Sequence, residues 1–84
     1  MNRVAVISAI LENPANNQQV FNDIVSSFHS IVRGRMGIPF DEHQIAVISL
    51  TLMGPLNEIN SLTGKLGSIP GVQVKAAISR TEII

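Results

Sequence analysis

Apolar side chains recur along the chain with strand-like and helix-like spacings in turn, and this order predicts the elements. Residues 3–11 form a β-branched, apolar run that ends before Asn13 and Pro14, which predicts a first strand. Asn13 suits a helix cap and Pro14 suits a first helical position. The apolar side chains that follow recur every three or four residues: Val20, Phe21, Ile24, Val25 and Phe28. We therefore predict a first helix from Pro14 to about His29.

Two more strands are predicted after this helix. Residues 31–38 form an extended run before Pro39, because proline disfavours helical geometry in the residue that precedes it. Residues 40–43 are predicted to be a connection. Residues 44–52 repeat the β-branched pattern and supply a third strand, which a Gly-Pro pair ends.

A second helix and a fourth strand complete the predicted order. Pro55 suits the first helical turn and Gly67 ends the regular part, while the apolar stripe steps through Ile59, Leu62, Leu66 and Ile69. Gly64 inside this helix predicts the close approach of a neighbouring group, because glycine costs about 1 kcal/mol there relative to alanine. Residues 72–79 supply the fourth strand, and residues 81–84 are expected to be a loose tail.

The order strand, helix, strand, strand, helix, strand defines the fold class. It is the α+β, ferredoxin-like βαββαβ pattern, in which two helices cover one face of a four-stranded antiparallel sheet. Right-handed crossovers place the first and third strands at the centre of that sheet. With 84 residues and no linker, the sequence predicts one domain over residues 1–84.

The two central strands carry apolar side chains on both faces of the predicted sheet. At the edges, polar residues share one face, Arg33 and Arg35 on the second strand and Gln73 and Lys75 on the fourth, and we expect this face to point away from the helices. An apolar strip with a polar rim marks an interface, and its predicted residues are Val4, Val6, Ile10, Ile45 and Val47. A second copy in two-fold symmetry is the simplest partner, so we predict a dimer or tetramer. A monomer with an apolar sheet face is the alternative.

Composition narrows the function classes. Charged residues make up only 14% of the chain and the net charge is zero, so no positive field attracts nucleic acid or an anionic membrane. The absence of cysteine excludes disulfides and thiolate metal sites, and a cytoplasmic location is expected. No apolar run approaches the ~20 residues that span a bilayer.

Four side chains are candidates for binding a small anion. The guanidinium groups of Arg33 and Arg35 could bind a carboxylate or phosphate through bidentate hydrogen bonds. Asn13 and Asn16 lie at the start of the first helix, where free N–H groups favour anions. The GxxG motif at residues 34–37 resembles the RNA clamp of KH domains, but that clamp joins two helices and this motif lies in a strand. We interpret its glycines as sites of a bulge or of close approach.

The chain has few side chains that are suited to catalysis or metal binding. The chain has no Cys or Tyr, and its serines lack a local nucleophile signature, so we predict no catalytic residue and no enzyme. His29 and His43, with Asp41 and Glu42 beside the latter, match no standard zinc spacing, so we predict no metal and no cofactor. A metal site or a small enzyme site assembled between subunits stays open as an alternative.

Two segments resemble a bacterial family of iron-only hydrogenase system regulators. They are Gly-Arg-Met-Gly-Ile-Pro-Phe at residues 34–40 and Leu-Thr-Gly-Lys-Leu-Gly-Ser-Ile-Pro-Gly-Val at residues 62–72, and residues 3–7 and 48–50 fit as well. The resemblance implies an ACT-like domain, related in fold to effector domains that bind amino acids and to the effector half of nickel-responsive regulators. Such domains form dimers or tetramers and often bind ligands between subunits. The His and Cys ligands of the nickel-responsive domains have no counterpart here, and no DNA-binding segment is expected.

The sequence therefore predicts a homo-oligomeric ACT-like regulatory domain that binds a small anionic metabolite or a partner protein. It predicts no direct contact with nucleic acid or membrane. The alternatives are a purely structural interaction module and a small ferredoxin-like enzyme with a site between subunits.

Overall fold

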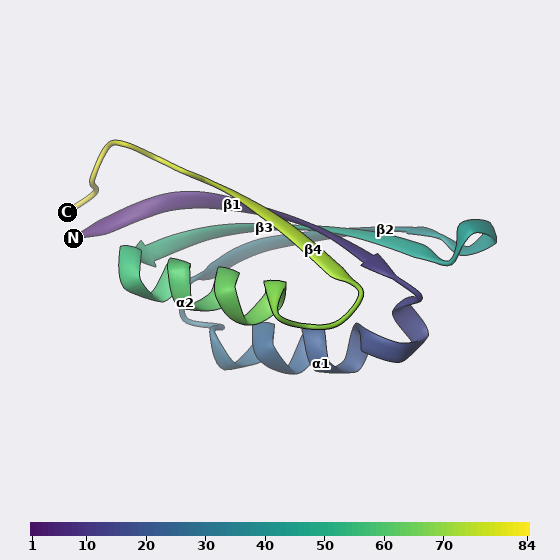
Figure 1. Cartoon of the computed structure of the whole chain (residues 1–84). Coiled ribbons are helices and arrows are strands. Elements are labelled where there is room, and N and C mark those ends of the chain that lie inside the picture. Colours follow the sequence, from purple (N-terminus) through teal and green to yellow (C-terminus); the bar gives the residue numbers. More distant parts are fainter.

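The computed structural model describes residues 1–84 and has the predicted order of elements (Figure 1). They are β1 (Asn2–Glu12), α1 (Pro14–Ser27), β2 (Val32–Phe40), the 3₁₀ turn η1 (Asp41–His43), β3 (Ile45–Pro55), α2 (Leu56–Gly67) and β4 (Val72–Ile78). The sheet order is β2-β3-β1-β4 with antiparallel neighbours throughout, and both helices lie on one face (Figure 1). The predicted ferredoxin-like fold, with the first and third strands at the centre, is confirmed.

The hydrophobic core lies between the helices and the sheet face that they cover. Alternate residues of β1 are buried there, from Ala5 to Leu11. The other large members of the core are Ile48, Leu50 and Leu52 of β3, Phe21 and Val25 of α1, Ile59, Leu62 and Leu66 of α2, and Ile31, Ile69 and Val72 from the connections and the start of β4. All 15 buried hydrophobic residues form one cluster, so the sheet face opposite the helices contributes nothing to the core.

The close approach predicted at a helical glycine lies elsewhere in the fold. At Gly64 a Cβ atom would meet nothing within 4 Å, so that prediction is wrong. At Gly54, near the end of β3, a Cβ atom would collide with Cγ2 of Ile31 and lie 3.0 Å from its Cβ. Because both residues are buried, it is Gly54 that lets the chain entering β2 pack against β3.

We expect Gly54→Ala to lower the free energy of unfolding by about 1–3 kcal/mol, the usual cost of forcing an extra methyl group into a packed core. Gly64→Ala is the matched control and should raise it by about 0.5–1 kcal/mol, because the helix there has room for the methyl group. Urea denaturation of both variants measures the difference. If the two variants unfold at the same urea concentration, the Ile31 side chain moves aside with no loss of stability.

Residues 81–84 are not the loose tail that we expected. Ile83 forms an antiparallel bridge with Asn2, with N–H···O bonds of 2.8 and 2.6 Å in the two directions. The Arg3 guanidinium adds a salt bridge to Glu82 at 3.2 Å and a hydrogen bond to the Ser79 carbonyl at 3.0 Å. The two chain ends therefore lie side by side (Figure 1). Neither helix has the length and hydropathy that crossing a bilayer requires.

A β-bulge in β2 reverses part of the predicted face assignment. Val32 pairs with Leu52 and Gly34 with Thr51, so Arg33 has no partner on β3. Since the extra residue shifts the alternation by one, Val32 packs against the core whereas the side chains from Met36 onward change face. The sequence pattern had placed Val32 and Met36 on the same face, which is wrong.

Arg35 consequently lies on the helix side of the sheet, and not on the open face that we had predicted for it. It is paired with Leu50, whose side chain is in the core. Its guanidinium donates to the Asn22 Oδ1 at 2.7 Å and lies 5.8 Å from the centre of the Phe21 ring. The side chain thus joins β2 to α1. Gln73 and Lys75 of β4 do lie on the open face, as predicted, opposite Ile10 and Ser8.

Candidate functional site: an asparagine pocket and an open sheet face

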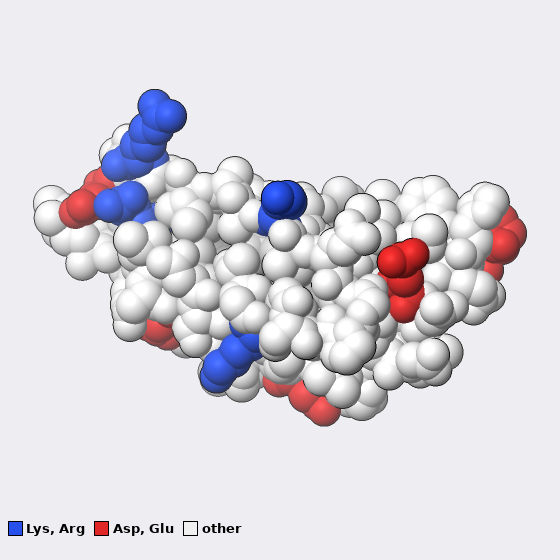
Figure 2. Space-filling view, viewed as in Figure 1, with Lys and Arg blue, Asp and Glu red and all other residues white.

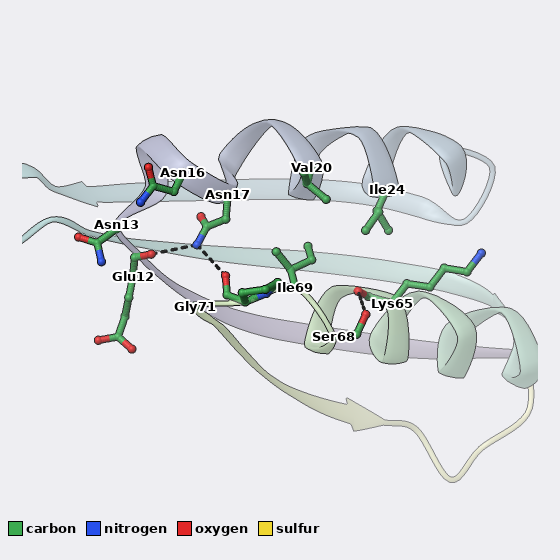
Figure 3. A pocket seen from close by; sticks show the side chains of 11 residues that line it. Glu12, Asn13, Asn16, Asn17, Val20, Ile24, Lys65, Ser68, Ile69 and Gly71 are labelled. Atoms are coloured by element: carbon green, nitrogen blue, oxygen red, sulfur yellow. Dashed lines mark hydrogen bonds between the residues drawn. The ribbon is translucent and has the colours of Figure 1, made fainter.

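A cavity of about 470 Å³ lies between the first half of α1 and the turn that joins α2 to β4 (Figure 3). Its wall comprises Glu12, Asn13, Asn16, Asn17, Val20, Ile24, Lys65, Ser68, Ile69, Pro70 and Gly71. Figure 3 shows Val20 and Ile24 of α1 pointing toward Ile69, so one wall is apolar, whereas the asparagines gather at the start of the helix. We call this cavity the asparagine pocket.

Asn17 is the one buried polar side chain of the fold, with 5% of its surface exposed. Its amide nitrogen donates to the Glu12 carbonyl at 2.9 Å and to the Pro70 carbonyl at 3.3 Å (Figure 3). It therefore ties the end of β1 to the turn before β4, which are far apart in the sequence. Its amide oxygen has no hydrogen-bond partner, although buried polar atoms normally have one.

Gly71 allows this tight arrangement. Its φ of +82° is in the left-handed region, and a Cβ atom there would lie 2.9 Å from the Asn17 Nδ2 and 3.1 Å from the Glu12 carbonyl oxygen. The Gly71 carbonyl also accepts a hydrogen bond from the Glu12 N–H at 2.8 Å. The back wall of the pocket is thus built from closely fitted backbone that only glycine permits.

The pocket offers neutral polar groups and not charges. The Glu12 carboxylate points away from it (Figure 3). The Lys65 ammonium lies 5.3 Å from the centre of the Phe28 ring and extends away from Asn17 (Figure 3). The Ser68 hydroxyl donates to the Lys65 carbonyl at 2.8 Å and keeps its lone pairs as acceptors. Amide and hydroxyl groups are therefore what a bound molecule would meet.

Asn13 shapes the pocket through its backbone. It is the N-cap residue of α1, directly before Pro14, as predicted, but it adopts left-handed angles (φ 53°, ψ 62°) and its side chain makes no capping hydrogen bond. Its N–H instead donates at 2.8 Å to the carbonyl of Gln44, which is also left-handed at φ 55°. The mouth of the pocket is thereby joined to the turn between β2 and β3.

The four predicted anion-binding residues are not brought together. Asn13 and Asn16 line the asparagine pocket, whereas Arg35 faces Asn22 and the bulged Arg33 is exposed on β2. Sequence reasoning missed Asn17. Its spacing of four residues from Phe21 and eight from Val25, both buried on α1, was the signal that it shares their face.

The sheet face opposite the helices exposes a row of large hydrophobic side chains. They are Val4 (36%), Val6 (41%), Ile10 (41%), Met36 (61%), Ile38 (47%) and Phe40 (40%), and the half-buried Ile45 and Val47 lie beside them. The register places all five residues of the predicted interface on this open face. At the end of the sheet near η1, Ile10, Phe40, His43, Ile45 and Val47 form an apolar cup of about 280 Å³.

The two histidines lie at opposite ends of the sheet. His29 follows α1, near Ile31, whose carbonyl accepts from the N–H of Met53 late in β3. His43 precedes β3, and its Nε2 is 3.9 Å from a Glu42 carboxylate oxygen with both side chains exposed. No three acidic, histidine or cysteine side chains come together as a metal site within the chain. The GxxG motif lies inside β2, with no helix on either side.

Surface charge is sparse as well. Figure 2 shows few Lys, Arg, Asp and Glu side chains on one side of the molecule; side chains of both signs lie together near one end, and uncharged atoms separate most of the others. The side chain of Arg3 is already paired with Glu82. That side of the molecule therefore has no large concentration of charge of either sign that would attract a highly charged partner.

Comparison with solved structures defines the class of protein. The ACT domain of a GTP pyrophosphokinase from Chlorobium tepidum superposes with a TM-score of 0.77 at 19% identity, over 92% of this chain and 100% of that one. The C-terminal domain of the MgtC protein from Mycobacterium tuberculosis has a TM-score of 0.66 at 21% identity, over 96% and 92% of the two chains. The fold is therefore that of an ACT-like domain.

The chain belongs to the TM1266-like family, described as "Iron-only hydrogenase system regulator, putative", whose sequence profile matches residues 3–76. The structure of the uncharacterized protein TM1266 from Thermotoga maritima is similar over 95% of this chain and 100% of that one, with 29% identity and a TM-score of 0.90. A search of the curated proteins found no match. The family resemblance seen in the glycine-containing segments is confirmed.

Proposed function

We propose that this chain is a regulatory domain of the iron-only hydrogenase system that responds to a small polar molecule in the asparagine pocket. The observation that supports the proposal is the pocket wall itself, where a buried asparagine with a free amide oxygen holds the turn before β4 against the junction of β1 and α1. Burying an unpartnered polar atom costs about 1–3 kcal/mol. A buried polar atom with this energetic cost suits a binding site in which the ligand supplies the missing hydrogen bond.

The lining of the pocket selects the chemistry of the ligand. Amides, one hydroxyl and an apolar wall suit a molecule of amino-acid size, with neutral or zwitterionic polar groups at one end and an apolar part at the other. The metabolite that the sequence suggested was anionic, but neither Arg33 nor Arg35 lines the pocket. An anion would have to rely on the start of α1 alone, so we rank it second.

Self-association is part of the proposal, because the open face exposes large hydrophobic side chains in one contiguous area. The pocket and this face share the end of β1. The Glu12 carbonyl oxygen lies in the pocket wall. Glu12 also pairs with Ile45, which lines the apolar cup. Asn13 and Gln44 form a second link through their backbones. A ligand that shifts the start of α1 would therefore reach the interface, and an effect on a partner protein could follow.

Thermal unfolding with a panel of amino acids and phosphorylated metabolites tests ligand binding. A ligand at 100 times its Kd stabilises by about 2.7 kcal/mol, which raises Tm by roughly 10–20 °C in a domain of this size. We expect an amino-acid-sized ligand to give such a shift, and Asn16→Ala to reduce it. Asn60→Ala, an exposed asparagine on α2 outside the pocket, is the matched control. If no compound shifts Tm, the ligand proposal is wrong and regulation through a partner protein is favoured.

A further inference from the structure

Polar and apolar side chains are unevenly distributed over the four strands of the open face. Three neighbouring strands carry its large apolar side chains: Met36, Ile38 and Phe40 on β2, Ile45 and Val47 on β3, and Val4, Val6 and Ile10 on β1. The outermost strand, β4, presents Gln73 and Lys75 instead. The apolar area is therefore centred on β3 and not on the middle of the sheet.

We infer that this face binds the same face of a second copy, about a two-fold axis that runs along β3. This inference deepens the self-association proposed above and rests on it. β3 of one copy then faces β3 of the other, and β1 faces the partner's β2. β4 lies outside the contact on each side, so that Lys75 stays in water.

The size of the area suits this occupant. Three strands spaced about 4.8 Å apart and about 33 Å long cover on the order of 500 Å² of plane, and side-chain relief adds to the accessible surface. A stable interface takes roughly 600–1,000 Å² of accessible surface from each partner. The contact would carry few charges, because only Glu12 and Lys75 project from the paired positions of the open face. A charged partner or a nucleic acid would meet no surface of opposite charge on this face.

The other way to pair two such sheets has its two-fold axis across the strands. That axis aligns each strand with its own copy, so β4 would face β4 and the two Lys75 ammonium groups would be held close together. Like charges placed opposite each other in a contact are unfavourable. An axis along β3 avoids this pairing and covers the apolar strands only, so we favour it over the axis across the strands.

Shape also favours an axis along β3. In the register of the sheet, Ile38 and Ile10 lie in one row with Val47 between them. The two-fold axis brings Ile38 of one copy over Ile10 of the other, at the border of the apolar cup that Ile10, Ile45 and Val47 line. In the middle of the face, Ser49 pairs with Ser8 and Met36. Ser49 therefore lies on the axis, where the hydroxyl groups of the two copies can donate to and accept from each other.

Cysteine cross-linking of the full chain distinguishes the arrangements, because the protein has no cysteine of its own. Ser49→Cys places one thiol on the axis, and disulfides do bridge packed sheets. Under mild oxidation, or with a short bis-maleimide, we expect most Ser49→Cys chains to become covalent dimers. Lys75→Cys, exposed on the same face, should give few dimers. The mass of both variants in solution is measured in parallel by light scattering.

Each outcome has a definite reading. Efficient dimers from Lys75→Cys would overturn the axis along β3 and support the axis across the strands, which also brings the two Ser49 positions together because Ser49, Ser8 and Lys75 lie in one row. A non-covalent dimer that cross-links at neither position would show that copies associate through another surface. A monomeric mass at high concentration would overturn self-association itself, which separates failure of the proposed function from failure of the arrangement.

Discussion

Asn17→Asp is expected to lower the free energy of unfolding by about 3–5 kcal/mol at neutral pH, although it exchanges only an NH₂ group for oxygen. The Asn17 Nδ2 donates to two carbonyl oxygens, at 2.9 and 3.3 Å, in a side chain that is 5% exposed. Aspartate would place a negative charge against both carbonyls, and an uncompensated buried charge costs this much. Because small domains have only about 5–15 kcal/mol in all, urea denaturation should show a variant close to unfolding.

Acid should partly rescue this variant. Once protonated, the carboxyl group introduced by the substitution carries no charge and can donate one hydrogen bond, so the deficit relative to the natural protein should shrink as the pH falls. Asn16→Asp is the control, since Asn16 is exposed at the start of α1, where a negative charge is neutral or stabilising by a few tenths of a kcal/mol. A loss below 1 kcal/mol in Asn17→Asp, or a loss independent of pH, would contradict the described role of Asn17.

The fold was predictable because local signals agreed with one another. The alternation of strand and helix spacings fixed the order of elements, and the four residues of the predicted stripe are all buried: Ile59, Leu62 and Leu66 on α2, and Ile69 in the turn that follows it. Boundaries shifted only by a few residues, as where α1 ends at Ser27 and not near His29. The five predicted interface residues were found from the apolar alternate positions of β1 and β3, since alternation in an unbroken strand determines which face each residue occupies.

What sequence reasoning missed depends on contacts between distant segments. The glycines of residues 34–37 were interpreted as sites of a bulge or of close approach, and a bulge does lie next to Gly34, but its effect on the faces was missed: it moves Met36 and Ile38 to the open face and Arg35 to the helix side. The asparagine pocket forms only when the Pro70 carbonyl reaches Asn17, 53 positions away in the chain. Neither alternation nor motif spacing contains that information. The tail was misjudged for the same reason, because Ile83 finds its partner in Asn2.

Ile10→Asp is expected to weaken self-association by at least 100-fold while the single chain stays folded. Ile10 is 41% exposed on the open face, so the carboxylate of an isolated chain stays in water. In the paired state each copy would bury one carboxylate among apolar side chains, and a cost of about 3 kcal/mol per dimer already exceeds a factor of 100 in Kd. Sedimentation over a range of concentrations should give the monomer, 9.1 kDa for the natural chain, at concentrations where we expect the natural protein to be a dimer.

Val20→Asp separates this effect from the general consequences of a new charge. Val20 is also β-branched and apolar and is 49% exposed, but it lies on α1, away from the open face. We therefore expect this variant to keep the mass of the natural protein. Circular dichroism of both variants confirms that each is folded, with a penalty of up to about 1 kcal/mol for aspartate in a central strand. A natural mass in Ile10→Asp would show that the open face stays in solvent, and loss of the dimer in Val20→Asp alone would place the interface on the helices.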